Sequence, residues 1–146
     1  MTGPKLQGDL SSILRCWRQF QYVYTADIKK MFRQIRVHLD NVDFSRILFR
    51  PQLDRSIQSY QLLTVTYGTV PAPYLAMRVL KQLAHDDDLS FPKARKILLN
   101  SLYVDDILFG PDDIRSLQEA REQLISLMSR GGFHLRKWPP IQRNCY

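Results

Sequence analysis

Three aspartates in this sequence stand where a solvent-exposed acid is not expected. Asp27 comes near the end of a β-rich run that begins at Tyr22, and Asp105 and Asp106 lie between two apolar stretches. Aspartate is disfavoured in strands, and burying a carboxylate without a partner is costly. Carboxylates that meet from neighbouring strands can bind divalent cations, and Mg²⁺ prefers such oxygen ligands. Two such ions, about 3.5–4 Å apart, can activate an attacking hydroxyl and stabilise the leaving oxygen in phosphoryl transfer.

Simpler explanations are open for the same residues. Aspartate is a common turn residue, so the Asp105-Asp106 pair could be only a hairpin tip. Asp27 could likewise cap a turn that begins at Ile28. Because Asp27 and the pair are far apart in sequence, only tertiary folding could bring them together.

The composition is that of one basic globular domain. The chain has 146 residues, of which 45% are hydrophobic and 24% charged, enough for one hydrophobic core. Its net charge of +7 favours polyanions such as nucleic acid, although a soluble basic protein without such a partner would have the same composition. Basic residues are dense in the first third, with Tyr and Phe between them, which suits either a nucleic-acid track or a solvated basic face. They are Arg15, Arg18, Lys29, Lys30, Arg33, Arg36, Arg46, Arg50 and Arg55.

Other features argue against a membrane, a signal sequence and a zinc site. No stretch approaches the roughly 20 apolar residues of a membrane span, and residues 1–8 lack the layout of a secretory signal. Cys16 and Cys145 are too few for a disulfide framework or a zinc cluster, so we expect a reducing compartment. His85 and the three acids at 86–88 could suggest a metal cluster, but a polar helix end explains them more simply.

Hydrophobic periodicity predicts an α+β fold. The expected helices cover residues 9–20, 72–86, 91–99 and 112–130, with a helical turn at 29–35. The expected strands cover 22–28, 44–50, 58–67 and 133–138, and 101–104 and 107–110 are the arms of a hairpin around Asp105-Asp106. The long helix should end at Gly131-Gly132 and bury Ile114, Leu117, Leu124, Leu127 and Met128. This order predicts an antiparallel sheet with helices packed on one face.

Four motifs follow one another along the chain. They are residues 26–35 around Asp27, residues 66–76 around Gly68, the tetrapeptide Tyr103-Val104-Asp105-Asp106, and residues 131–138. In this order and spacing they resemble the reverse transcriptases, whose catalytic hairpin carries Tyr-x-Asp-Asp. Their wording is most similar to the BEL/Pao group of long-terminal-repeat retrotransposons. The resemblance covers roughly residues 3–138 and implies a polymerase palm with a ferredoxin- or RRM-like core.

The resemblance implies an RNA-directed DNA polymerase that uses two Mg²⁺ or Mn²⁺ ions. Asp27 and Asp105 would be the principal metal ligands and Asp106 a supporting one, while Lys137 would protonate the leaving pyrophosphate. The implied nucleotide-binding residues are Ile28, Lys30, Met31, Phe32, Tyr67 and Gly68, and the implied nucleic-acid-binding residues are Pro73, Tyr103 and Val104. The expected partners are an RNA or DNA template with its primer and deoxynucleoside triphosphates, with no membrane.

Two of the nucleotide-binding positions have a second explanation. Phe32 matches the family's aromatic that packs under the sugar and excludes a 2′-hydroxyl, but it could be a core aromatic beside Met31 and Ile35. Gly68 permits close approach of a ligand to the backbone, and it could equally be a plain turn glycine.

The basic pair at the end of the fourth motif is similarly open. Lys137, together with Arg136, could be a solvated pair or a pair that steers phosphate. The sequence also departs from the family at two positions. Tyr67 stands where many retroviral relatives have glutamine, and Lys29 stands where this group is expected to have an acid.

The resemblance also implies a domain organisation. We expect residues 1–146 to form a single palm domain in which residues 1–22 are a residual part of the fingers. Most of the fingers, the thumb and a ribonuclease H domain are expected to lie outside this chain, in a larger polyprotein found in a cytoplasmic particle or the nucleus. The alternative function is a non-catalytic, nucleic-acid-binding remnant of a truncated retroelement polyprotein.

Overall fold

The computed structural model describes residues 3–86, 89–138 and 142–143. Cys145 and the acids Asp87 and Asp88 lie outside these residues. Cys16 is a free, exposed thiol. In the part of the chain that the structure describes, no helix is both long enough and apolar enough to cross a membrane.

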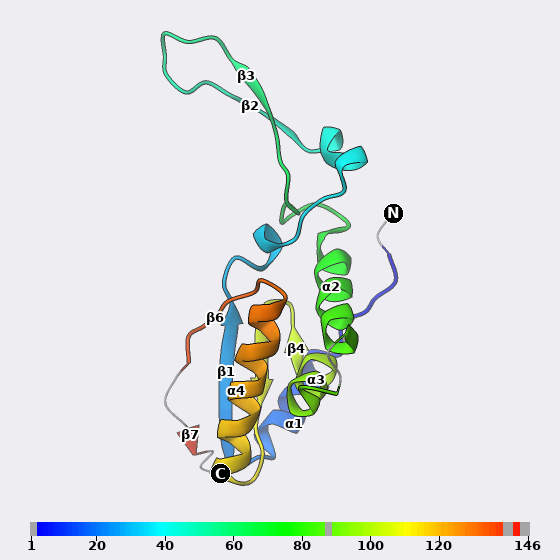
Figure 1. The fold of residues 1–146 in the computed structure, drawn as a ribbon, viewed down its shortest axis with the longest axis vertical. Helices are drawn as coiled ribbons and strands as arrows, with labels where there is room; N and C mark the ends of the chain where they lie inside the picture. Colours follow the sequence, from blue (N-terminus) through cyan, green and yellow to red (C-terminus); the bar gives the residue numbers. More distant parts are fainter. Residues whose placement is uncertain (1–2, 87–88, 139–141, 144–146) are drawn as a thin grey trace.

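An antiparallel sheet forms the centre of the body (Figure 1). Its central strand β1 (Tyr22–Ile28) pairs with β5 (Asp106–Phe109) along one edge and with β6 (Leu135–Arg136) and β7 (Gln142–Arg143) along the other. Strand β4 (Leu102–Tyr103) extends the sheet beyond β5. The order β4-β5-β1-β6, with every pair antiparallel, confirms the predicted α+β fold.

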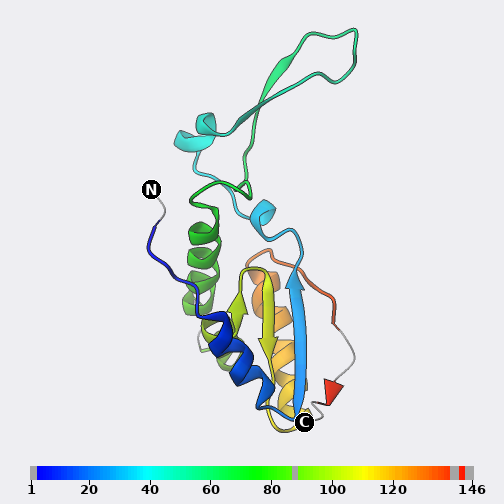
Figure 2. The same cartoon turned by 180° about the vertical axis from the view of Figure 1, so that it is seen from behind.

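Helices α4, α3 and α2 form a layer on one face of the sheet. In Figure 1, α4 (Ile114–Arg130) lies in front of β1, with α3 (Pro92–Asn100) and α2 (Ala72–Asp86) packed in sequence beside it. Helix α1 (Leu10–Arg18) contacts β4 and β5 and lies in front of the sheet in Figure 2, where α4 lies behind it.

Alternation along the strands separates the core from the acids. Ala26 and Ile28 of β1 and Ile107 of β5 are buried in the hydrophobic core that α2, α3 and α4 cover. Side chains of a strand alternate between its faces, so Asp27 and Asp106 point to the opposite face. The buried residues of the three helices are Ala72, Ala76, Met77, Leu80, Ala84, Ala94, Ile97, Leu98, Leu117, Ala120, Leu124, Leu127 and Met128.

Local signals place most element boundaries correctly. Strand β1 and helix α2 have the predicted bounds, and Asp9 caps α1 by accepting a hydrogen bond from the Ser12 amide at 2.9 Å. Helix α4 begins at Ile114, two residues later than the predicted start at 112, because Asp113 caps it by accepting a hydrogen bond from the Ser116 amide. The predicted buried stripe is wrong at Ile114, which is 42% exposed because it lies at the solvent-facing start of α4.

The strands predicted at 44–50 and 58–67 form a hairpin of their own. Strand β2 (Arg46–Phe49) pairs only with β3 (Gln58–Gln61), and the hairpin projects away from the body in Figure 1. We call residues 46–61 the arm. All of its residues are exposed, so β2 and β3 share no core with the central sheet.

Two 3₁₀ helices connect the body to the arm. The first, η1 (Met31–Gln34), confirms the helical turn predicted at 29–35, and the second is η2 (Leu39–Phe44). Strand β3 ends earlier than predicted because the chain beyond it returns toward η1, where the Val65 amide donates to the Ile35 carbonyl at 2.9 Å.

A glycine turn brings β6 beside β1. After α4, the amide of Gly132 donates to the carbonyl of Ser129 and the amide of Phe133 to that of Met128, which together close the end of the helix. Gly132 has a φ of +75°, a left-handed conformation that glycine adopts without penalty. Phe133 is then 2% exposed, and the chain enters β6 in register with β1.

This turn gives a test of the connection to β6. Gly132→Ala should lower the free energy of unfolding by about 1 kcal/mol, because alanine is strained at positive φ although open space surrounds the added carbon. Gly132→Asn should lose less, because asparagine tolerates this conformation. Urea unfolding of both variants measures the difference, and equal losses would contradict the backbone explanation.

Candidate active site

The predicted acids meet at one end of β1. Asp27 lies directly opposite Asp106 in the β1–β5 register, and the amide of Ile28 donates to the carbonyl of Asp105 at 2.8 Å. Directly opposed residues have Cβ atoms about 4.5–5.5 Å apart. The pairing therefore places three carboxylates at the same end of the sheet.

The hairpin carrying two of these acids turns one residue earlier than predicted. Tyr103 pairs with Asp106, which leaves Val104 and Asp105, rather than Asp105 and Asp106, as the two-residue connection. Val104 has a φ of +53°, a rare conformation for a β-branched residue that costs on the order of 1–3 kcal/mol. Cross-strand pairing decides this register, and it puts Asp106 in the strand opposite Asp27 while Asp105 occupies the tip.

Asp27 is buried and ion-paired. Its side chain is 7% exposed; one carboxylate oxygen accepts a hydrogen bond from Nε of Arg136, and the other accepts from Nζ of Lys137 at 3.1 Å. Arg136 lies opposite Asp27 in the β1–β6 register. The hydrogen bond from Arg136 holds the pKa of Asp27 below its ordinary value; burial opposes this shift and the hydrogen bond from Lys137 reinforces it.

Neighbouring residues of a strand normally point to opposite faces, yet Arg136 and Lys137 both reach Asp27. Lys137 has a φ of +60°, in the left-handed region that a residue other than glycine adopts at a cost. This conformation, directly after β6, interrupts the alternation and turns both basic side chains to one carboxylate. Arg136 is a site residue that the motifs did not single out, and its position beside Lys137 in the fourth motif was the signal that could have identified it.

Asp106 has the opposite electrostatics. Partial desolvation raises the pKa of Asp106, although the residue stays exposed, and the nearby carboxylates of Asp105 and Asp27 raise it further, whereas Lys137 lowers it. Carboxylates that repel one another are a donor set that a hard divalent cation would stabilise.

The acids do not yet converge on one point. Among the residues that the structure describes, no three Asp, Glu, His or Cys side chains lie close enough to hold a metal ion. The oxygens of Asp27 face Arg136 and Lys137 instead. Three neighbouring carboxylates are ligands of the kind that a divalent cation prefers, but a cation at Asp27 would compete with Arg136 and Lys137.

The predicted nucleotide-binding residues after Asp27 differ in exposure. Ile28 and Met31 are 1% and 3% exposed and belong to the core, so only their backbone can face a ligand. Lys30 is exposed and has a φ of +51°. Phe32 is half-buried and packs against the core, as expected of a core aromatic. Part of its ring stays accessible.

Tyr67, Gly68 and Pro73 come from a different segment, which leads into α2. Tyr67 is 73% exposed, and Gly68 has a φ of +84° with open space around it. Pro73 is exposed in the first turn of α2. Because the Val65 amide ties this segment to Ile35, these residues border η1 rather than pairing with the acids directly.

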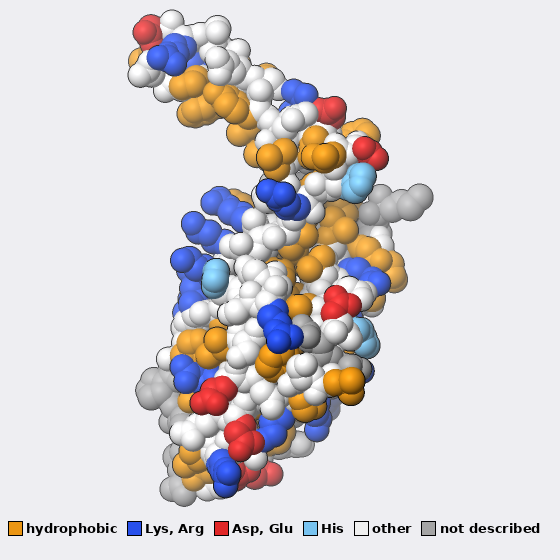
Figure 3. Space-filling model, viewed as in Figure 1, with side chains coloured by type: hydrophobic (Ala, Val, Ile, Leu, Met, Phe, Trp, Pro, Cys, Tyr) orange, Lys and Arg blue, Asp and Glu red, His pale blue; other side chains and the backbone are white. Residues whose placement is uncertain are grey.

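Basic side chains gather beside this end of the sheet. In Figure 3, Lys and Arg side chains line the edge of the body below the arm, where Figure 1 shows β6 and η1. The exposed basic residues of these segments include Lys29, Lys30, Arg33 and Arg136. Such a group favours the approach of phosphate anions.

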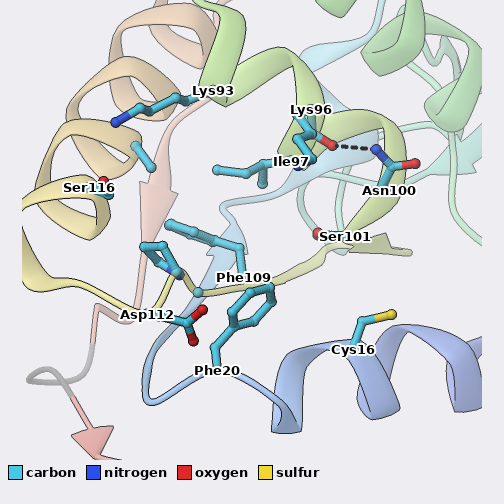
Figure 4. A pocket seen from close by; sticks show the side chains of 13 residues that line it. Cys16, Phe20, Lys93, Lys96, Ile97, Asn100, Ser101, Phe109, Asp112 and Ser116 are labelled. Atoms are coloured by element: carbon cyan, nitrogen blue, oxygen red, sulfur yellow. Dashed lines mark hydrogen bonds between the residues drawn. The ribbon is translucent and has the colours of Figure 1, made fainter.

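A separate cavity of about 530 Å³ lies at the other end of β5 (Figure 4). It opens between α1, α3 and the start of α4, and its lining includes Phe20, Ile97 and Phe109. Strand β5 runs from Asp106 at the acidic end to Phe109 at the cavity, so the cavity is not part of the candidate active site.

The fold and the acids define a class: an α+β palm-like domain with carboxylates at adjacent strand ends. The family described as reverse transcriptase (RNA-dependent DNA polymerase) matches residues 7–137, and the chain belongs to this family. A search of curated proteins found no match. The family indicates an RNA-directed DNA polymerase, a nucleotidyltransferase that acts on a template with primer and deoxynucleoside triphosphates. Reverse transcriptases generally use divalent metal ions.

The opposite pKa shifts of the two paired acids predict opposite effects on stability. The lowered pKa means that ionised Asp27 stabilises the fold above its ordinary pKa of 3.8, and this contribution is lost as the pH falls through the folded-state value. The raised pKa of Asp106 means that ionisation of this carboxyl opposes folding once the pH rises above its ordinary pKa of 3.8. Asp27→Asn should therefore lower the free energy of unfolding at pH 7 by about 1–3 kcal/mol. Asp106→Asn should raise it by a smaller amount, because this side chain is more exposed.

Urea unfolding at pH 7 and at pH 3 measures both effects. The difference between wild type and Asp27→Asn should shrink at the lower pH, because the Asp27 carboxyl of the unfolded chain, with its ordinary pKa of 3.8, is then mostly protonated. Unchanged stability of Asp27→Asn at pH 7 would show that Arg136 and Lys137 contribute nothing net to this site.

Proposed function

We propose that this chain is the catalytic palm of an RNA-directed DNA polymerase that adds deoxynucleotides to a primer 3′-hydroxyl by two-metal-ion nucleotidyl transfer. One observation carries the proposal: Asp27 faces Asp106 across the β1–β5 pair, with Asp105 at the adjoining tip. Asp27 and Asp105 are the principal ligands of Mg²⁺ or Mn²⁺, and Asp106 supports them.

Bound divalent cations would activate the primer hydroxyl and neutralise charge on the phosphates. The protein positions the carboxylates and the basic side chains. The β1–β5 ladder fixes the spacing of the acids, because main-chain hydrogen bonds hold Ala26 opposite Ile107 beneath them. Arg136 and Lys137 put positive charge beside the carboxylates, where phosphates approach, and Lys137 donates the proton to the leaving pyrophosphate.

The segment after Asp27 binds the incoming nucleotide in this proposal. The backbone of Ile28, Lys30 and Met31 lies beside the triphosphate, because the side chains of Ile28 and Met31 are committed to the core. The accessible part of Phe32 packs under the sugar. Tyr67 and Gly68 border the same segment through the contact between Val65 and Ile35.

Template and primer lie along Pro73, Tyr103, Val104 and the arm. On the arm, the rings of Phe49 and Tyr60 lie 6.2 Å apart at 65°, and they are 55% and 39% exposed. Exposed arginines accompany these rings along residues 46–55. Aromatic rings and basic side chains together suit stacked bases and a phosphate backbone.

The subgroup of the family and the parent polyprotein are inferred from the amino-acid sequences of the four motifs. These sequences point to a BEL/Pao retrotransposon, with residues 1–146 as one palm domain of a larger polyprotein and residues 1–22 as a part of the fingers.

A second candidate function is nucleic-acid binding without catalysis. It is favoured by the two ion pairs of Asp27, which leave neither of its oxygens without a basic partner. Under this alternative the acids are structural, and the exposed basic residues and the arm bind the nucleic acid.

Primer extension on an RNA template with Mg²⁺ or Mn²⁺ separates the two functions. Asp105→Asn should reduce extension by about 100-fold or more, because it removes a principal ligand. Asp112→Asn, at an exposed position before α4 and beyond the end of β5 that is remote from the acids, removes the same charge and should leave extension unchanged. Extension that persists in Asp105→Asn rules out the proposed mechanism. Template binding without extension by any variant favours the non-catalytic function.

The role of Phe32 is tested by the choice of sugar. Phe32→Ala should raise the incorporation of ribonucleotides relative to deoxynucleotides by about tenfold or more, because the ring would no longer exclude a 2′-hydroxyl. The matched control is Phe44→Ala, which truncates an 86% exposed ring in η2. If both variants keep the wild-type ratio, Phe32 is a core residue only.

A further inference from the structure

Both oxygens of Asp27 are held by side-chain cations. Nε of Arg136 donates to Oδ2, and Nζ of Lys137 donates to Oδ1 at 3.1 Å. The carboxylate is 7% exposed, so little of it remains open to a further ligand. Each oxygen keeps a second lone pair, but the side chain is buried and both of its oxygens face cations, so a divalent cation would compete with Arg136 and Lys137 for Asp27.

The backbone brings this basic pair to Asp27 from two directions. The β1–β6 register sets Arg136 opposite Asp27, and the left-handed φ of +60° at Lys137 brings the next side chain to the same place. A residue other than glycine holds that conformation at an energetic cost, which the contact with Asp27 offsets. Loss of the contact would favour a relaxed backbone at Lys137.

The segment that carries the pair is short and anchored at both ends. Strand β6 has two residues, and the amide of Lys29 donates to the carbonyl of His134 at 2.8 Å beside it. Before the segment, Phe133 is buried in the core. After it, Trp138 lies 5.0 Å from the guanidinium of Arg121. Phe133 and Trp138 lie outside residues 134–137, so their contacts need not change if this segment leaves β1, whereas the Lys29–His134 hydrogen bond and the β1–β6 pairing would be lost.

The charges favour exchange between the pair and a divalent cation. Asp27, and at longer range Asp105, attract Arg136, while Asp106 lies within the field of Lys137. The same three carboxylates would attract a divalent cation, so the basic side chains and the metal compete for one negative site.

We infer that Arg136 and Lys137 form a cationic latch, which neutralises Asp27 when no divalent cation is bound and is released when one binds. The inference rests on the proposed function, because it takes Asp27 as a metal ligand. The latch removes the penalty of a buried, unpaired carboxylate in the metal-free protein. Its release frees two basic side chains for the phosphates of an incoming nucleotide.

The test is Mn²⁺ binding to the full chain, without nucleotide or template. Arg136→Gln removes the competing charge and should tighten Mn²⁺ binding by about tenfold, the fold-change expected when a charge-assisted hydrogen bond no longer has to be broken. Lys29→Gln is the matched control: it removes a charge from the adjoining end of β1 that makes no ion pair with Asp27 in the structure, and it should change binding far less.

A second measurement on the wild type does not depend on the folding of a variant. The Nε–H signal of Arg136 in an NMR spectrum should show a hydrogen-bonded, slowly exchanging proton without metal, and it should lose that protection when Mg²⁺ is added. The amide of Lys29 should exchange faster as residues 134–137 leave β1.

The outcomes distinguish the latch from the metal site itself. If Asp105→Asn abolishes Mn²⁺ binding but Arg136→Gln tightens it no more than Lys29→Gln does, the latch is wrong. The metal site then still stands. An unchanged Arg136 signal in metal-saturated protein overturns the latch as well. Binding that is the same in wild type and Asp105→Asn, or no binding by wild type and Arg136→Gln alike, overturns the metal site and the latch together.

Discussion

The ion pairs of one buried carboxylate join the first strand of this domain to the segment that follows its last helix. Asp27 lies on the central strand and is buried, so the fold must give its carboxylate partners. Those partners come from the far end of the chain, because Arg136 and Lys137 reach Asp27 only after α4 has crossed the sheet and the Gly132 turn has returned the chain to β1. The core that holds α4 against β1 therefore also determines the electrostatics of the acidic site.

Unfavourable conformations gather around the acids. Val104 and Lys137 both have positive φ, although neither is glycine, and each adjoins a carboxylate or holds one. Asp106 carries a charge that its neighbours disfavour. The core and the paired strands compensate for this local cost, which is the pattern expected where structure serves binding or catalysis rather than stability alone.

The body and the arm are stabilised differently. The body has a continuous core between its sheet and helices. The arm is a two-stranded hairpin of exposed residues, whose polar contacts centre on Asp43, which accepts hydrogen bonds from Arg46 and Gln61. A hairpin of this kind is marginally stable by itself. Its exposed aromatic and basic side chains are the ones that the proposed template-binding role of the arm would use.

The sequence by itself determined the fold class and the bounds of β1 and α2, and it singled out the three acids, because periodicity and short motifs are local properties. It misplaced the hairpin turn, the end of β3 and the exposure of Ile114, each of which depends on what another segment contacts. Only the tertiary structure decided that Asp27 faces Asp106 and is held by Arg136 and Lys137. The physical reason is that strand register and the left-handed turn at Lys137 are selected by long-range pairing and packing, which outweigh the preferences of the residues involved.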